Sequence, residues 1–143
     1  MYKPTTFLFL LMLGAPATSI AENAIEQRWR IINYWSVTCA PCRIEIPELN
    51  KLSEELEAAE IAVLGVNFDD DDRPRTLMLA ERMGIEFPTL TRPASTALDI
   101  EPPNVLPTTV ILSPEGEVKA TLVGAQTSES IKQQLRLVIG AKP

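Results

Sequence analysis

Apolar residues along the chain fall into short runs that polar stretches and prolines separate. Two runs rich in β-branched and other apolar residues, at 30–35 and 61–68, predict buried strands. A third strand is predicted at 108–112. The turn sequence Ser-Pro-Glu-Gly at 113–116 follows it, and the alternating segment 117–123 predicts the return strand of a hairpin.

Helical spacing of apolar residues occupies the stretches between these strands. It predicts helices at about 41–59, 75–83 and 128–139, and one further turn near 94–98. The predicted apolar positions of the first helix are Ile44, Leu49, Leu52 and Leu56. Pro47 lies inside this helix and predicts a kink. The order of elements predicts an α/β fold with a central mixed β-sheet flanked by helices on both faces.

The N-terminal residues 1–21 have the pattern of a secretory signal peptide. A positive charge precedes the apolar run 7–13, and small residues then lead to an A-x-A-like cleavage site after Ala21, with Ala17 as the alternative site. An uncleaved membrane anchor fits less well, because a span needs roughly 20 apolar residues. The expected mature domain is 22–143, in an oxidising compartment outside the cytoplasm.

Composition removes several classes of function. The chain has 143 residues, the length of one domain, and a net charge of −6. We expect no nucleic-acid partner, because phosphate contacts need clustered cations. The absence of His excludes His-based triads and metal sites. The acidic run 69–72 lacks EF-hand spacing, so it is predicted as a solvated loop that caps the next helix, and no metal is expected.

The motif that carries chemistry is Cys39-Ala40-Pro41-Cys42, placed directly after a predicted strand and at the start of a predicted helix. The first turn of a helix offers unpaired N–H groups and a positive dipole end, which favour a thiolate at the first cysteine. Arg43 adds a nearby cation. We therefore expect Cys39 to be the exposed nucleophile and Cys42 the deeper resolving thiol in exchange through a mixed disulfide.

Two other interpretations of the motif are weaker. A zinc site needs further ligands, and the chain has neither a second C-x-x-C nor a His. A purely structural disulfide would close a very short ring and so remove little chain entropy. No cofactor is expected beyond the redox-active Cys39–Cys42 disulfide.

Two segments resemble a known family. The segment 33–49, NYWSVTCAPCRIEIPEL, resembles the active-site segment of the thioredoxin superfamily, and most closely its exported TlpA/ResA/DsbE-like branch of thiol–disulfide reductases. Leu-Pro-Thr-Thr at 106–109, followed by Ser-Pro-Glu-Gly at 113–116, is similar to the second signature of that branch. The resemblance covers about 31–139 and implies a thioredoxin-like fold.

The resemblance implies roles for residues around the motif. Pro107 matches the cis-proline that faces the two sulfurs, and the backbone of Leu106 before it would pair with the substrate chain. Glu45 matches a buried acid of this branch, and its expected role is to take or give the proton of a cysteine thiol, with a pKa raised by burial. Periodicity alone would instead favour a solvated charge on the helix face for Glu45.

Other positions near the motif are interpreted from the same resemblance. Asn33 stands where cytosolic thioredoxins carry a buried Asp, which leaves the glutamate as the main proton carrier. Trp35 is expected to pack beneath the active-site loop, and Pro47 matches the kink of the active-site helix. Pro41 lies between the cysteines, where the dipeptide tunes the potential. Thr38 replaces the Trp that many relatives carry before the first cysteine, and it is expected on the partner-binding surface.

The resemblance implies an exported disulfide reductase of the periplasm or another extracytoplasmic compartment. Targets of the family include apocytochrome c cysteine pairs, and a membrane thiol donor of the DsbD/CcdA type would re-reduce the protein. A net oxidase or isomerase, or a module that binds clients without turnover, stays open. Relatives carry an N-terminal hairpin before the first core strand, and only 22–29 stands there in this chain, so an exposed sheet edge is expected.

Overall fold

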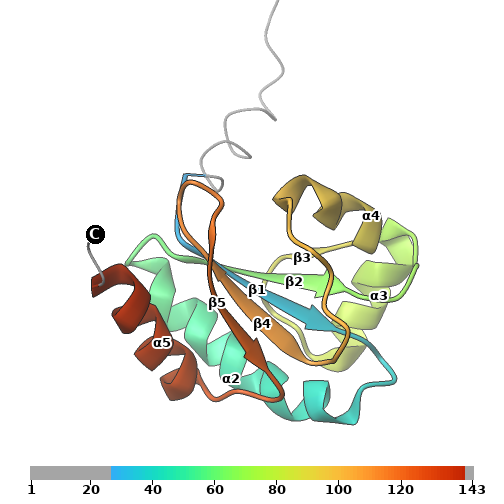
Figure 1. The fold of residues 1–143 in the computed structure, drawn as a ribbon. Coiled ribbons are helices and arrows are strands. Elements are labelled where there is room, and N and C mark those ends of the chain that lie inside the picture. Colours follow the sequence, from blue (N-terminus) through green and yellow to red (C-terminus); the bar gives the residue numbers. More distant parts are fainter. Residues whose placement is uncertain (1–26, 141–143) are drawn as a thin grey trace, which may run out of the picture.

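The computed structural model describes residues 27–140, so the signal peptide predicted at 1–21 lies outside the described residues. At the centre is a five-stranded mixed sheet in the order β3-β2-β1-β4-β5 (Figure 1). The strands are β1 (Arg30–Trp35), β2 (Ala62–Asn67), β3 (Thr89–Leu90), β4 (Thr108–Leu112) and β5 (Val118–Val123). β1 is the central strand, parallel to β2 and antiparallel to β4. The predicted mixed sheet is confirmed.

Helices cover both faces of this sheet, as predicted (Figure 1). They are α2 (Ala40–Glu57), α3 (Arg73–Met83), α4 (Arg92–Ser95) with the 3-10 turn η1 (Thr96–Leu98), and α5 (Ser128–Gly140). α2 and α5 pack side by side on one face, and the segment around η1 packs on the other. α3 packs against the first half of α2. Pro47 lies inside α2, which continues through it.

The buried face of α2 contains three of the four predicted apolar positions. The helix buries Cys42, Glu45, Ile46, Leu49, Leu52 and Leu56. Ile44, which the periodicity placed on this face, is 73% exposed. Five residues separate Ile44 from Leu49, which puts the two side chains about 140° apart around the helix axis. Ile46 is one turn before Leu49 and takes the buried place. The prediction is therefore wrong for Ile44.

β3 is an edge strand that the sequence did not predict. It pairs with β2 only from Gly65, which lies opposite Thr89. Gly65 donates its N–H to the carbonyl of Pro88 at 2.8 Å. Pro88 has no N–H of its own, so it cannot extend the ladder back toward Val63. Within the described residues β2 therefore has no partner strand on its outer side before Gly65.

The acidic run after β2 caps α3, as predicted. Asp72 is the N-cap residue and accepts a hydrogen bond from the Arg75 N–H at 2.9 Å. Asp71 forms an ion pair with Arg75 at 2.7 Å. Asp70 is exposed, and its side chain makes no hydrogen bond within residues 27–140. α3 ends at Met83 and is capped by Gly84, whose φ of 74° suits a residue without a Cβ.

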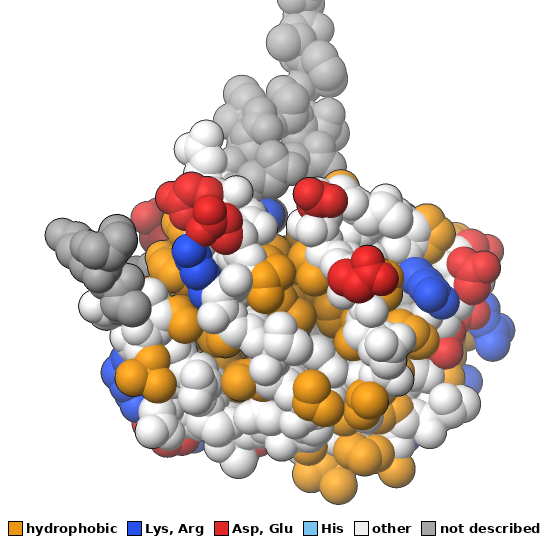
Figure 2. All heavy atoms as spheres, in the orientation of Figure 1, with side chains coloured by type: hydrophobic (Ala, Val, Ile, Leu, Met, Phe, Trp, Pro, Cys, Tyr) orange, Lys and Arg blue, Asp and Glu red, His pale blue; other side chains and the backbone are white. Residues whose placement is uncertain are grey.

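No helix in the described part of the chain is long and apolar enough to cross a membrane. Within 27–140, no three His, Cys, Asp or Glu side chains come together as a metal site. Figure 2 shows one face of the molecule, where acidic and basic side chains are interspersed with apolar ones and no continuous basic surface forms.

Candidate active site

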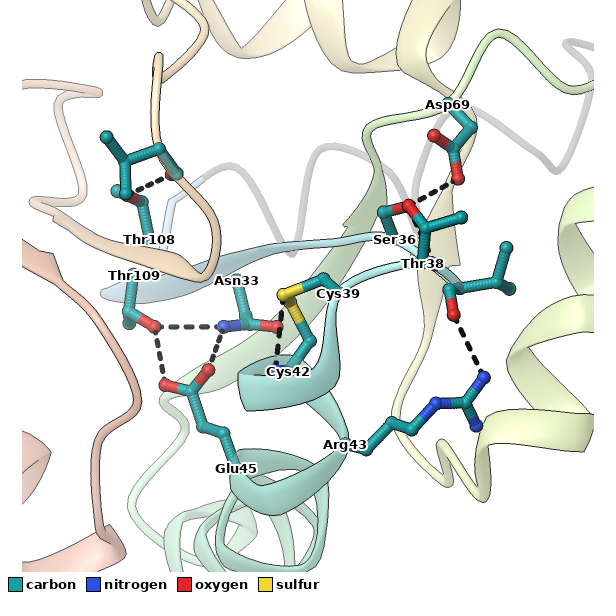
Figure 3. Close-up of a disulfide and its surroundings, with 12 residues drawn as sticks. Asn33, Ser36, Thr38, Cys39, Cys42, Arg43, Glu45, Asp69, Thr108 and Thr109 are labelled. Carbon is teal, nitrogen blue, oxygen red and sulfur yellow. Dashed lines mark hydrogen bonds between the residues drawn. A yellow bond between two sulfur atoms is a disulfide. The ribbon is translucent and has the colours of Figure 1, made fainter.

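Cys39 and Cys42 form a disulfide at the N-terminus of α2 (Figure 3). Cys39 is the N-cap residue, and its Sγ accepts a hydrogen bond from the Cys42 N–H at 3.2 Å. Pro41 sits in the first turn, where a missing N–H costs no helical hydrogen bond. Cys39 is partly exposed, whereas Cys42 is only 1% exposed. The more accessible sulfur is thus the one at the helix N-cap.

Glu45 is buried in the next turn of α2, with 1% of its surface exposed. Its carboxylate accepts hydrogen bonds from three segments of the chain (Figure 3). Asn33 Nδ2 of β1 donates to Oε2 at 3.0 Å, and Thr109 Oγ1 of β4 donates to Oε1 at 3.2 Å. The backbone N–H of Gln126, between β5 and α5, also donates to Oε1 at 3.2 Å. Glu45 is therefore not a solvated charge on the helix face.

Burial raises the pKa of Glu45 above its ordinary value, because the charged carboxylate loses its water. The hydrogen bonds from Asn33, Gln126 and Thr109 act in the opposite direction, because they favour the charged form. Burial outweighs them, so the pKa of Glu45 stays above that of an exposed glutamate.

Asn33 and Thr109 lie directly opposite each other on β1 and β4. Asn33 Nδ2 also donates to Thr109 Oγ1 at 3.0 Å, so these two side chains and Glu45 form a closed triangle of hydrogen bonds. Neither Thr109 nor Gln126 was predicted from the sequence as a partner of Glu45. β4 has the sequence TTVIL, and a polar side chain in a buried strand was the signal available for Thr109. Gln126 contributes a backbone group, so its side-chain type gave no signal.

The peptide bond between Leu106 and Pro107 is cis, as the resemblance implied. Pro107 is buried, and its carbonyl accepts a hydrogen bond from the Gly124 N–H at 2.9 Å. Leu106 packs against the cluster that contains Cys42 and also against the core cluster on the other face of the sheet. No hydrogen bond within residues 27–140 uses the N–H or C=O of Leu106. This backbone is available to another chain.

The loop before Cys39 is tied to the acidic loop after β2. Ser36 Oγ donates to Asp69 Oδ2 at 2.8 Å and accepts from the Thr38 N–H at 3.2 Å (Figure 3). Thr38 is exposed, at the position expected for partner contact. Trp35 is fully buried beneath this loop, and its Nε1 donates to Thr89 Oγ1 at 3.1 Å. Ser36 and Asp69 were not identified from the sequence, because their contact joins two separate loops.

Known proteins resemble this chain over most of its length. The model of the AhpC/TSA family matches residues 12–121. The thiol-disulfide oxidoreductase ResA of Geobacillus thermodenitrificans is 31% identical over 107 residues, which cover 75% of this chain and 61% of that protein. The thiol:disulfide interchange protein DsbE of Pseudomonas aeruginosa is 25% identical over 134 residues, covering 93% and 72%. The chain therefore spans only about three fifths of the ResA relative's length.

Solved structures show the same fold. StoA from Bacillus subtilis superimposes with a TM-score of 0.64 at 19% identity, over 76% of this chain and 83% of that chain. A secreted thiol-disulfide isomerase from Corynebacterium glutamicum superimposes with a TM-score of 0.65 at 28% identity, over 86% and 75%. These likenesses confirm the thioredoxin-like fold that the sequence predicted, and the names of the relatives agree with the predicted branch.

Proposed function

Because the chain belongs to the AhpC/TSA family, we propose that it is an exported thiol–disulfide oxidoreductase that reduces disulfides in extracytoplasmic proteins. The observation that carries the proposal is the hydrogen bond from the Cys42 N–H to Cys39 Sγ at the N-cap of α2. In the reduced protein, this N–H and the positive end of the helix dipole favour a thiolate at Cys39. A thiolate that is also partly exposed is the attacking group that disulfide exchange needs.

Reduction of a client takes two exchange steps. The Cys39 thiolate attacks one sulfur of the client disulfide, which forms a mixed disulfide and releases the client's other sulfur as a thiolate. Cys42 then loses its proton and attacks the Cys39 sulfur, which closes the Cys39–Cys42 disulfide and frees the second client thiolate. The client gains two electrons and the protein loses two. The oxidised pair therefore needs an external thiol donor before the next turnover.

We assign to Glu45 the transfer of the proton of the Cys42 thiol. Glu45 lies in the next turn of α2, and burial raises its pKa, which brings the carboxylate closer to the pKa of a thiol. It takes the proton of Cys42 in the resolving step and returns it when the pair is reduced again. Asn33 and Thr109 fix the carboxylate through their hydrogen bonds and are positioning residues.

Clients meet the protein around the cis-proline and the active-site loop. The available backbone of Leu106 supports pairing with an extended client segment, and exposed Thr38 supports a contact on the other side of the sulfurs. We assign exported proteins as clients, apocytochrome c cysteine pairs among them, and a membrane thiol donor of the DsbD/CcdA type as the source of electrons. A signal peptide at 1–21 would deliver domain 22–143 to the periplasm or another extracytoplasmic compartment.

The reduction potential of the Cys39–Cys42 pair tests the direction of the reaction. The protein is equilibrated with glutathione buffers, and the fraction of disulfide is measured. We expect a potential near that of thioredoxin, roughly −270 mV, which suits a reductase. A potential near that of a strong periplasmic oxidant, about −120 mV, would make the protein a disulfide donor and overturn the proposal.

Single cysteine variants test whether the protein turns clients over. Cys42→Ser is expected to trap a client as a stable mixed disulfide, because the resolving thiol is missing, and Cys39→Ser is expected to trap nothing. The reverse result would exchange the two roles. Wild-type protein that captures a client disulfide but never releases it reduced would be a binding module and not an enzyme.

A further inference from the structure

A cavity of about 370 Å³ lies beside the active-site loop, between α2 and α3. It is lined by Val37, Arg43, Arg75, Leu79, Arg82 and Met83. Val37 precedes Cys39 by two residues and Arg43 directly follows Cys42, so two of the lining residues flank the cysteine motif in the chain. Figure 3 shows Arg43 on one side of the disulfide and Thr109 on the other. The cavity therefore lies outside the carboxylate cage of Glu45.

The three arginines of this cavity are only partly neutralised. Arg75 forms an ion pair with Asp71 at 2.7 Å. Arg43 Nη2 donates to the Val37 carbonyl at 2.9 Å, and neither Arg43 nor Arg82 forms an ion pair among residues 27–140. The chain as a whole has a net charge of −6. A local positive site on such a protein attracts anionic groups to one place while the rest of the surface repels them.

The local structure holds two of these guanidinium groups in position, those of Arg43 and Arg75. The hydrogen bond to Val37 fixes Arg43 against the active-site loop. On α3, Arg75, Leu79 and Arg82 repeat at the helical period, and they line the cavity together with Arg43 of α2. Guanidinium groups bind carboxylates in a planar, two-point geometry that an ammonium group cannot reproduce. The rim is therefore suited to a carboxylate.

The floor of the cavity is apolar. Leu79 and Met83 are buried, and Val37 is half-buried. A ligand that fits both parts has a short aliphatic stem and a carboxylate, which describes an Asp or Glu side chain. We infer that this cavity binds an acidic residue of the client, close in sequence to the cysteine that Cys39 attacks. The inference rests on the proposed function, because it defines the class of client for the same site.

Matched peptides test this inference. One peptide, closed by a single disulfide, carries Asp or Glu beside its cysteines, and the other carries Asn or Gln at the same positions. Pre-reduced protein is mixed with each peptide, and the rate of peptide reduction is measured at low and high salt. We expect faster reduction of the acidic peptide, and we expect the preference to shrink at high salt, since screening weakens exposed charge pairs.

Variants of Arg82 show whether the cavity produces the preference. Arg82→Gln is expected to lower the ratio of acidic to neutral rates by about two- to fivefold, the effect of one exposed charge pair. Arg82→Lys is expected to keep only part of the ratio, because it keeps the charge but not the two-point geometry. Arg73→Gln removes the same charge from α3 outside the cavity and is expected to leave the ratio unchanged. An equal ratio in wild type and Arg82→Gln would overturn the inference. A fall of the rates for the acidic and the neutral peptide by the same factor in Arg82→Gln would also overturn the inference, because the arginine would then act on the Cys39 thiolate and not on the client.

Binding separates this inference from the proposed function. The same two peptides, with Ser in place of both cysteines, are titrated into the oxidised protein. Tighter binding of the acidic peptide, weakened by Arg82→Gln, would support the acidic-client site even if neither disulfide peptide were reduced. Equal binding of the two peptides would overturn it even if both disulfide peptides were reduced.

Discussion

Thr109→Val tests the cage around the buried carboxylate most directly. Valine has nearly the shape of threonine but replaces the hydroxyl group with a methyl group. The change removes the hydrogen bond from Thr109 Oγ1 to Glu45 Oε1, at 3.2 Å, and the one from Asn33 Nδ2 to Thr109 Oγ1, at 3.0 Å. All three side chains are buried, so water cannot replace either bond.

The cost follows from the two bonds. A hydrogen bond to a charged group contributes about 1.5–3 kcal/mol and a neutral one about 0.5–1.5 kcal/mol. We expect Thr109→Val to lose about 2–4 kcal/mol of unfolding free energy where Glu45 is ionised. Burial already raises the pKa of Glu45, and the loss of a bond that favours the charged form raises it further. The loss of unfolding free energy is therefore greatest at a pH above the raised pKa of Glu45. It becomes smaller as the pH falls through that pKa, because a protonated carboxyl group forms only the weaker hydrogen bond of an uncharged acceptor.

Denaturant unfolding of the oxidised protein at neutral and acid pH measures this loss. Thr109→Ser is the matched control, because it keeps the hydroxyl group and loses only a methyl group, about 1 kcal/mol at either pH. The reasoning fails if Thr109→Val loses the same free energy at both pH values, or no more than Thr109→Ser. The effect would then come from packing and not from the carboxylate.

Two further variants test the site and the fold. Glu45→Gln removes the proton acceptor, so we expect slower exchange above the raised pKa of Glu45 and little effect below it; an unchanged pH–rate profile would remove Glu45 from the mechanism. Gly65→Ala places a Cβ 2.8 Å from the Thr89 hydroxyl and 3.0 Å from Trp35 Nε1, and we expect a loss of about 1–3 kcal/mol on unfolding. Gly140→Ala, whose Cβ meets nothing within 4 Å, is the control; equal stability of the two variants would contradict the packing argument.

Much of the fold could be predicted because most elements are long enough to show a period. The exception is β3, whose two residues cannot show alternation and which forms only where the Gly65 N–H meets the Pro88 carbonyl. The error at Ile44 has a different cause. Ile44 lies about 140° around the helix axis from Leu49, whereas Ile46 lies one turn before Leu49, so the helical spacing itself favours Ile46 as the buried position.

The site divides in the same way into a local and a non-local part. Cys39 and Cys42 could be identified because their spacing and their position at the start of a helix are local properties. The donors to Glu45 are not local: Thr109 is 64 residues away and Gln126 is 81 residues away. The register of β1 against β4 and the return of the chain after β5 bring them together, and a single sequence does not show either.

The four aspartates after β2 look equivalent in the sequence, but we expect them to accept substitution during evolution to different extents. Asp69 accepts a hydrogen bond from Ser36 of the active-site loop, Asp71 forms an ion pair with Arg75, and Asp72 caps α3. The side chain of Asp70 makes no hydrogen bond or ion pair within the described residues. Substitution of Asp70 would leave the loop geometry unchanged. Substitution of Asp69 would remove the hydrogen bond to Ser36, in the loop that carries the nucleophile Cys39. Variation in this run should therefore begin at position 70.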